Sequence, residues 1–117
     1  MKKVLTLQNL GWVFTAFAAV MMVMSGIQKV MGAQEMVNNF TYMKILPYLT
    51  FVGILEIVGV FLLLLNKTSV YGAALIGSLM SAAVVMHLAV INSSPLIPIV
   101  IGASAWLGYM FRSMKTA

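Results

Sequence analysis

Four long apolar runs, separated by shorter polar stretches, dominate the sequence. They cover about residues 11–30, 48–65, 70–91 and 96–111. A helix needs about 17–25 predominantly apolar residues to cross a bilayer, and the last run lies close to that lower limit. Short connections make consecutive spans antiparallel neighbours. The pattern therefore predicts an all-α membrane protein whose four spans form an antiparallel transmembrane bundle.

The longest connection between the predicted spans, residues 31–47, has an amphipathic pattern of its own. Apolar and polar positions alternate at helical spacing: Met36, Val37, Phe40 and Met43 on one side, and Gln34, Glu35, Asn38 and Asn39 between them. This spacing favours a short helix over residues 34–46 that lies on the membrane surface and ends before Pro47. The alternative interpretation is a solvated loop.

Composition supports the membrane assignment and narrows the classes of function. The chain is 62% hydrophobic and only 8% charged, with a mean hydropathy of +1.06, whereas soluble domains are about 25% charged. We expect one transmembrane domain over residues 1–117, without a separate linker. The sequence has no cysteine, which excludes disulfides and thiolate metal sites. The net charge of +5 does not indicate nucleic-acid binding, because the basic residues lie at the ends of the apolar runs.

The distribution of basic residues predicts an orientation. Four spans place both chain ends and the 66–69 turn on one side, which then holds Lys2, Lys3, Lys67, Arg112 and Lys115. The other side holds Lys44, with Lys29 at its border. The positive-inside rule then places both termini in the cytoplasm of a multi-pass plasma-membrane protein. The basic start resembles a signal peptide, but we interpret the first run as an uncleaved span.

Three ionisable residues lie within the predicted spans. Glu56 is near the middle of the second span, Lys29 closes the first, and His87 is one turn before the end of the third. An intramembrane carboxylate needs a partner, a proton or water. We therefore predict a pocket in which Lys29, Glu56 and His87 bind a ligand or relay protons. Alternatively, Lys29 is an interfacial anchor and His87 donates to a carbonyl one turn earlier.

Small residues near these positions favour close packing of the helices. Glycine and alanine let transmembrane backbones approach one another. The expected packing positions are Gly26, Gly53, Gly59, Gly72, Gly77 and Ala83.

Several of these motifs resemble the DoxX-like family of small four-span membrane proteins. The resemblance rests on Gly26-x-x-Lys29, Gly53-x-x-Glu56-x-x-Gly59, the Asn-Lys-Thr turn after a leucine run, Gly72, and Ala83-x-x-x-His87. It covers about residues 11–112 and implies an antiparallel four-helix membrane bundle. It further implies one of several roles: a subunit of quinone-linked sulfur oxidation, a partner in a membrane redox complex, or an assembly factor.

The sequence lacks a phosphate-binding loop, a His/Cys metal motif and a nucleophile–base pair, so no catalytic residue is assigned and no metal is expected. The sequence contains 11 methionines. We interpret them as flexible side chains that fill the packing rather than as ligands of a soft metal. We expect an accessory subunit of a membrane redox or quinone-linked complex, not an enzyme on its own, with a non-covalent quinone or lipid-like ligand. The alternatives are a proton-coupled transporter, a hydrophobic-ligand binder, or an assembly scaffold. The expected partners are the bilayer, further copies of the chain or a larger membrane complex.

Overall fold

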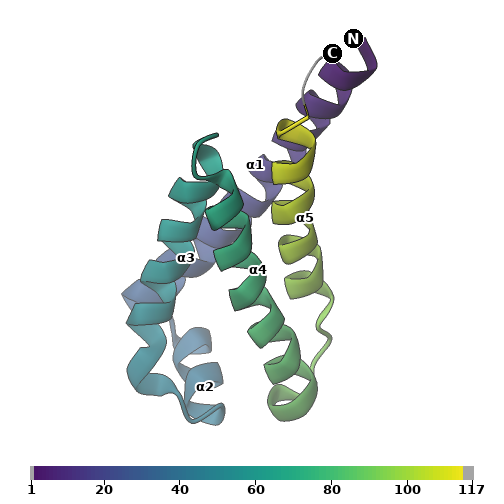
Figure 1. Cartoon of the computed structure of the whole chain (residues 1–117). Helices are drawn as coiled ribbons and strands as arrows, with labels where there is room; N and C mark the ends of the chain where they lie inside the picture. Colours follow the sequence, from purple (N-terminus) through teal and green to yellow (C-terminus); the bar gives the residue numbers. More distant parts are fainter. Residues whose placement is uncertain (1, 115–117) are drawn as a thin grey trace.

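The computed structural model describes residues 2–114, and these form helices joined by short connections (Figure 1). The α-helices are α1 (Lys2–Met31), α2 (Gln34–Tyr42), α3 (Leu49–Leu64), α4 (Ser69–Met86) and α5 (Leu96–Arg112). A 3₁₀ turn, η1 (Leu46–Tyr48), precedes α3, and a π-helical turn, η2 (His87–Ile91), follows α4. The predicted all-helical membrane bundle is confirmed. Lys115, one of the basic residues that predict the cytoplasmic side, lies outside the described residues.

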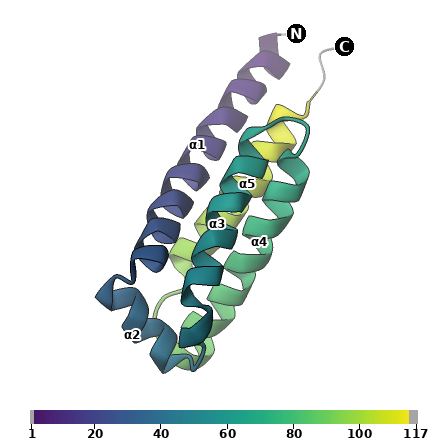
Figure 2. The same ribbon diagram turned by 90° about the vertical axis from the view of Figure 1, so that its left-hand side faces the viewer.

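The four long helices form a ring in which α1 packs against α3 and α5, and α4 packs against the same two helices. Each helix is therefore antiparallel to both of its neighbours (Figure 2). The start of α1 and the end of α5 meet at one end, where Gln8 Nε2 donates a hydrogen bond to the carbonyl of Met114. We call this the termini end; the opposite end, where α2 lies, is the α2 end.

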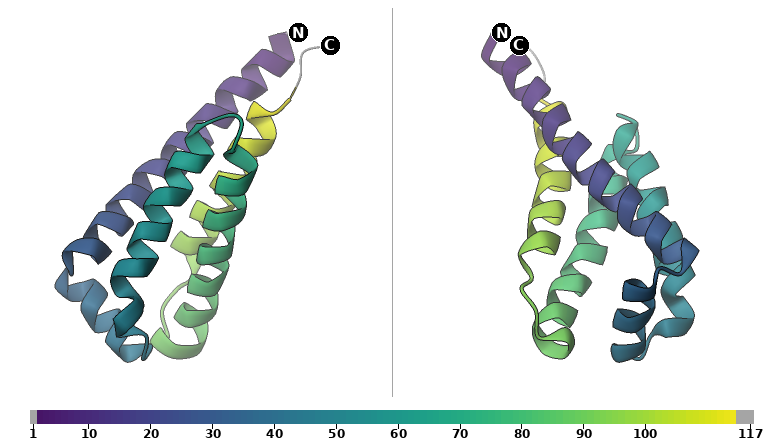
Figure 3. Two further views of the ribbon diagram at one scale, coloured as in Figure 1. Left: turned by 60° about the vertical axis from the view of Figure 1, so that its left-hand side comes forward. Right: turned by 180° about the vertical axis from the view of Figure 1, so that it is seen from behind.

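The crossing of α1 determines where the bundle is tight. This helix crosses the others diagonally, in front of them in the right-hand view of Figure 3, so its first half lies beside α5 and its second half beside α3. Gly11 and Thr15 of α1 pack on α5, since a Cβ at Gly11 would lie 2.8 Å from the Arg112 nitrogen. Gly26 packs on α3. At the α2 end, α5 and the second half of α1 consequently diverge.

Helix lengths differ in detail from the predicted spans. Helix α1 begins at Lys2 rather than near Gly11, because no helix-breaking residue occurs in that stretch and the chain simply continues in helical form. Three helical segments are long and apolar enough to cross a membrane: Leu5–Met31, Leu46–Leu64 and Ser69–Ile91. The fourth, α5, has 17 residues, or about 25 Å at 1.5 Å per residue.

Helix α2 ends earlier than predicted and turns its apolar side toward the bundle. Lys44 adopts a left-handed conformation with φ of 64°, which stops the helix after Tyr42 and redirects the chain into η1. Phe40 is 6% exposed, and Met36 and Met43 face the space between the long helices. The helix therefore directs these side chains toward the bundle, whereas the sequence predicts a helix that lies on the membrane surface.

Close backbone contacts at glycines set the spacing of neighbouring helices. A Cβ on Gly72 of α4 would lie 2.6 Å from the Leu63 Cα and 2.8 Å from the Gly59 carbonyl oxygen of α3. Such distances are shorter than van der Waals contact, so only a hydrogen atom fits there. The buried core next to this contact is built from Ala18, Ala19, Met22, Val60, Leu63, Ala73, Ile76, Met80, Ile101 and Ala105.

Arg112 of α5 contacts both α1 and α3 at the termini end. Its Nη1 donates to the Leu63 carbonyl at 2.7 Å, and its Nη2 donates to Asn66 Oδ1 at 2.7 Å. The guanidinium also lies 3.8 Å from the ring centroid of Trp12 on α1. The last carbonyls of a helix have no partner within it and carry partial negative charge. Arg112 of α5 therefore caps α3 while it stacks on α1.

Candidate functional site

A cavity of about 600 Å³ occupies the space where α1 and α5 diverge. Its wall is formed by residues of α1, α2, α3, α4, η2 and the first half of α5. Its polar members are Ser25, Gln28, Lys29, Glu35, Asn39, Glu56, His87, Ser93 and Ser94. Small-molecule sites in proteins typically measure about 300–1,000 Å³, and this cavity falls within that range.

An ion pair between α1 and α3 forms the deepest polar part of the wall. Lys29 Nζ lies 2.8 Å from one oxygen of Glu56 and 3.2 Å from the other. It also donates to Ser25 Oγ, one turn back on α1, and lies 5.9 Å from the Phe40 ring centroid. Lys29 is 8% exposed and Glu56 only 1%. The ammonium group thus has three oxygen atoms within hydrogen-bond distance, which compensates for the cost of burying both charges.

Two glycines allow this ion pair to form. A Cβ on Gly53 would lie 2.9 Å from the Gly26 carbonyl oxygen and 2.9 Å from the Lys29 Cβ. The reverse contact is equally close, because a Cβ on Gly26 would lie 2.9 Å from the Gly53 oxygen. The backbones of α1 and α3 therefore touch one turn before the charged residues, and Lys29 reaches Glu56 across this contact.

His87 belongs to the same cavity wall but has a different partner. Its Nδ1 lies 2.7 Å from the carbonyl oxygen of Ala83. A carbonyl can only accept, so Nδ1 is the donor in this hydrogen bond. Within residues 2–114, no hydrogen bond joins His87 to Lys29 or Glu56. His87 also begins the π-helical turn η2, a geometry that often occurs at functional sites.

Sequence reasoning did not identify two features of the cavity. Glu35, assigned only to the polar face of α2, lines the cavity beside Met36 and Asn39. Methionines from α1, α2, α4 and the connection after α2 converge there as well: Met21, Met22, Met24, Met36, Met43, Met80 and Met86. The spacing of Met36, Phe40 and Met43 indicates that α2 has an apolar face. The sequence does not show whether this face contacts lipid or the other helices.

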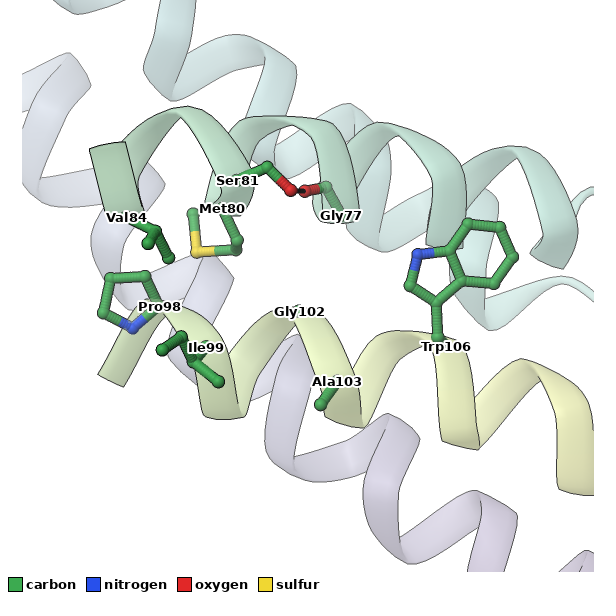
Figure 4. Close-up of a pocket in the computed structure, with 9 residues that line it drawn as sticks. All are labelled: Gly77, Met80, Ser81, Val84, Pro98, Ile99, Gly102, Ala103 and Trp106. Carbon is green, nitrogen blue, oxygen red and sulfur yellow. Dashed lines mark hydrogen bonds between the residues drawn. The ribbon is translucent and has the colours of Figure 1, made fainter. Parts of the chain in front are cut away.

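A second, smaller pocket of about 270 Å³ lies between α4 and α5 (Figure 4). Trp106 closes one end of it, and a Cβ on Gly77 would lie 3.2 Å from the Trp106 Cδ1. Ser81 Oγ donates to the Gly77 carbonyl at 2.8 Å, so its hydroxyl proton is already used. None of the residues that line this pocket is titratable, and we therefore regard the larger cavity as the candidate site.

The chemistry of the larger cavity suits an organic ligand better than a metal ion. Within residues 2–114, no three His, Cys, Asp or Glu side chains lie close enough together to hold a metal. Methionine is flexible and polarizable and adapts to irregular apolar shapes. A space lined by methionines and by polar groups from several elements is accordingly suited to an apolar molecule that has a polar end.

The fold and this cavity define a small all-α integral membrane protein that encloses a polar group between its helices. The model of the DoxX-like family matches residues 13–108, most of the chain, and the protein belongs to that family. No curated protein and no solved structure matches the chain.

Proposed function

We propose that this membrane protein binds an elongated apolar ligand with a polar head in the cavity beside Lys29, Glu56 and His87. In this proposal the protein acts as an accessory subunit of a larger membrane complex. The family resemblance implies that this complex is a quinone-linked redox complex. The observation that carries the binding proposal is the cavity of about 600 Å³, which combines methionine walls with a buried ion pair.

The membrane placement in this proposal follows the basic residues. Lys2, Lys3, Lys67 and Arg112 belong to the termini end, and Lys44 to the α2 end. With the termini end in the cytoplasm of a plasma-membrane protein, the cavity lies in the outer half of the bilayer. A lipid-like ligand would then reach it from the outer leaflet, because exposed residues such as Met24 and Ile97 form part of its margin.

A purely structural role is the second candidate, and the close pairing of Lys29 favours it. Ser25 Oγ and both oxygens of Glu56 lie within hydrogen-bond distance of its ammonium group, so no ligand is needed to compensate its charge. The protein would then be an assembly factor or scaffold in which the ion pair joins α1 to α3. Proton-coupled transport, the remaining alternative, would require Glu56 to separate from Lys29 in each cycle.

A pair of bulky substitutions on α4 tests the binding proposal. Ala82 lines the cavity and is exposed, whereas Ala74 is exposed on the same helix but outside the cavity. The protein is placed in nanodiscs of zwitterionic lipid, and native mass spectrometry measures adducts with single-chain amphiphiles of varied head group. We expect a saturable one-to-one adduct that Ala82→Phe removes and Ala74→Phe preserves. The absence of such an adduct with every amphiphile would contradict the proposal.

A further inference from the structure

The acidic residues of the chain are concentrated at the cavity. The sequence holds 2 acidic residues and 7 lysines and arginines; both acids, Glu35 and Glu56, line the cavity, whereas among the described residues Lys29 is the one lysine or arginine that does so. Lys29 neutralises Glu56 at 2.8 Å. Within residues 2–114, no Lys, Arg or His nitrogen forms a salt bridge with Glu35. A strongly basic protein thus encloses a cavity whose ionised side chains sum to one negative charge.

The glutamates of the cavity accept hydrogen bonds, and its one lysine is already engaged. Lys29 has Ser25 Oγ and both oxygens of Glu56 within hydrogen-bond distance. Carboxylates only accept, and with its Nδ1–H directed at Ala83, the neutral form of the His87 ring has Nε2 as an acceptor. The amides and hydroxyls on the wall can serve in either sense. A ligand head group that donates hydrogen bonds therefore complements these groups better than one that only accepts them.

We propose that the natural ligand of the cavity is an amphiphilic amine, a single apolar chain that ends in a protonated ammonium group. This inference rests on the binding function proposed above and specifies its ligand class. The ammonium group lies near Glu35, at the exposed margin of the cavity, and donates hydrogen bonds to acceptors there. The apolar chain lies among the methionines, whose polarizable thioethers adapt to its shape.

Charge and burial both favour this ligand class over its rivals. A carboxylate head would face the uncompensated charge of Glu35, which is repulsive at close range. A neutral hydroxyl could donate one hydrogen bond but would leave that charge without a partner. Glu35 is exposed and Glu56 is buried, so a cation can approach Glu35 without separating Lys29 from its own partner.

A series of probes with one chain length and different heads tests the ligand class. Radiolabelled dodecylammonium, dodecyltrimethylammonium, dodecanol and dodecanoate are equilibrated with the protein in nanodiscs of zwitterionic lipid, and binding to empty nanodiscs is subtracted. We expect dodecylammonium to bind saturably and about fivefold more tightly than dodecanol, as one ion pair near a surface contributes up to about 1 kcal/mol. Dodecyltrimethylammonium, which lacks N–H donors, should bind more weakly than dodecylammonium, and dodecanoate most weakly.

Two variants of α2 with the same change in net charge connect the effect to Glu35. Glu35→Gln removes the carboxylate, whereas Gln34→Lys adds a positive charge at an exposed neighbour outside the cavity. We expect dodecylammonium to lose about fivefold in affinity with Glu35→Gln and less than twofold with Gln34→Lys. Dodecanol binding should change in neither.

The outcomes separate this inference from the binding proposal. Saturable binding of dodecanol, dodecanoate or dodecyltrimethylammonium that equals or exceeds that of dodecylammonium would overturn the amine while the binding function stands. Equal losses in the two α2 variants would overturn the role of Glu35 in the same way. No saturable binding of any of the four probes would overturn both proposals.

Discussion

Lys29 and Glu56 form an ion pair between α1 and α3 that is almost completely enclosed, with Nζ 2.8 Å from Oε2 and 3.2 Å from Oε1. The pair joins the second half of α1 to the first half of α3 at the point where Gly26 and Gly53 bring the two backbones into contact. It also forms part of the cavity wall. The pair therefore holds α1 against α3 and, in the proposed function, forms part of the wall of the binding cavity.

Removal of one partner of this pair should destabilise the protein, and removal of both should restore stability. Glu56→Gln leaves the buried Lys29 without a counter-charge, and loss of one member of a buried pair costs about 3 kcal/mol in free energy of unfolding. Lys29→Met in the same chain should recover most of that loss, because no charge is then buried. Unfolding in mixed micelles with increasing denaturing detergent measures both variants. A double variant no more stable than Glu56→Gln would contradict this interpretation.

Gly72 should tolerate no side chain, whereas Gly102 should. A Cβ on Gly72 would lie 2.6 Å from the Leu63 Cα, a backbone atom that cannot move aside. We expect Gly72→Ala to lower the free energy of unfolding by about 1–3 kcal/mol through overpacking. At Gly102 the nearest atom is the Met80 Cβ at 3.3 Å.

Gly102→Ala is the matched control for that experiment. Its smaller steric cost is offset by a gain in helix propensity of about 0.5–1 kcal/mol, so its stability should remain near that of the wild type. Thermal unfolding in the same detergent compares the two variants. Equal destabilisation by Gly72→Ala and Gly102→Ala would show that the α3–α4 contact is not as close as described.

Arg112 should contribute stability through its hydrogen bonds rather than through its charge alone. Arg112→Lys keeps the charge but loses the planar group that contacts the Leu63 carbonyl, Asn66 and the Trp12 ring at the same time. Hydrogen bonds to charged groups contribute about 1.5–3 kcal/mol, and we expect a loss of about 2 kcal/mol. Lys67→Gln, which removes a charge from an exposed position, should have little effect. Unchanged thermal stability in Arg112→Lys would contradict this role.

The orientation in the membrane can be tested with single cysteines, since the natural chain has none. Tyr42 on α2 is 67% exposed, and Lys67 lies in the exposed turn between α3 and α4 at the termini end. In intact cells an impermeant maleimide should label Tyr42→Cys, and Lys67→Cys only after permeabilisation, as the distribution of basic residues implies. Labelling of both variants from outside would contradict cytoplasmic termini.

The class of protein and its helices follow from the hydropathy pattern alone. Four apolar runs must satisfy their backbone groups within a bilayer, so they form helices, and short polar connections make successive helices antiparallel. The predicted and observed spans agree to within a few residues at α3, α4 and α5. Helix α1 begins about two turns earlier than expected, because hydropathy marks where apolar residues begin and not where a helix begins.

The arrangement of the polar groups, in contrast, depends on how the helices pack in three dimensions. Hydropathy and spacing place Lys29, Glu56 and His87 in separate helices, but the pairing depends on the diagonal crossing of α1 and on the Gly26–Gly53 contact. His87 bonds to Ala83 of its own helix instead. The same crossing separates α1 from α5 at the α2 end and leaves the cavity that Glu35 lines. Such details follow from helix packing between residues far apart in the chain, which a one-dimensional pattern does not specify.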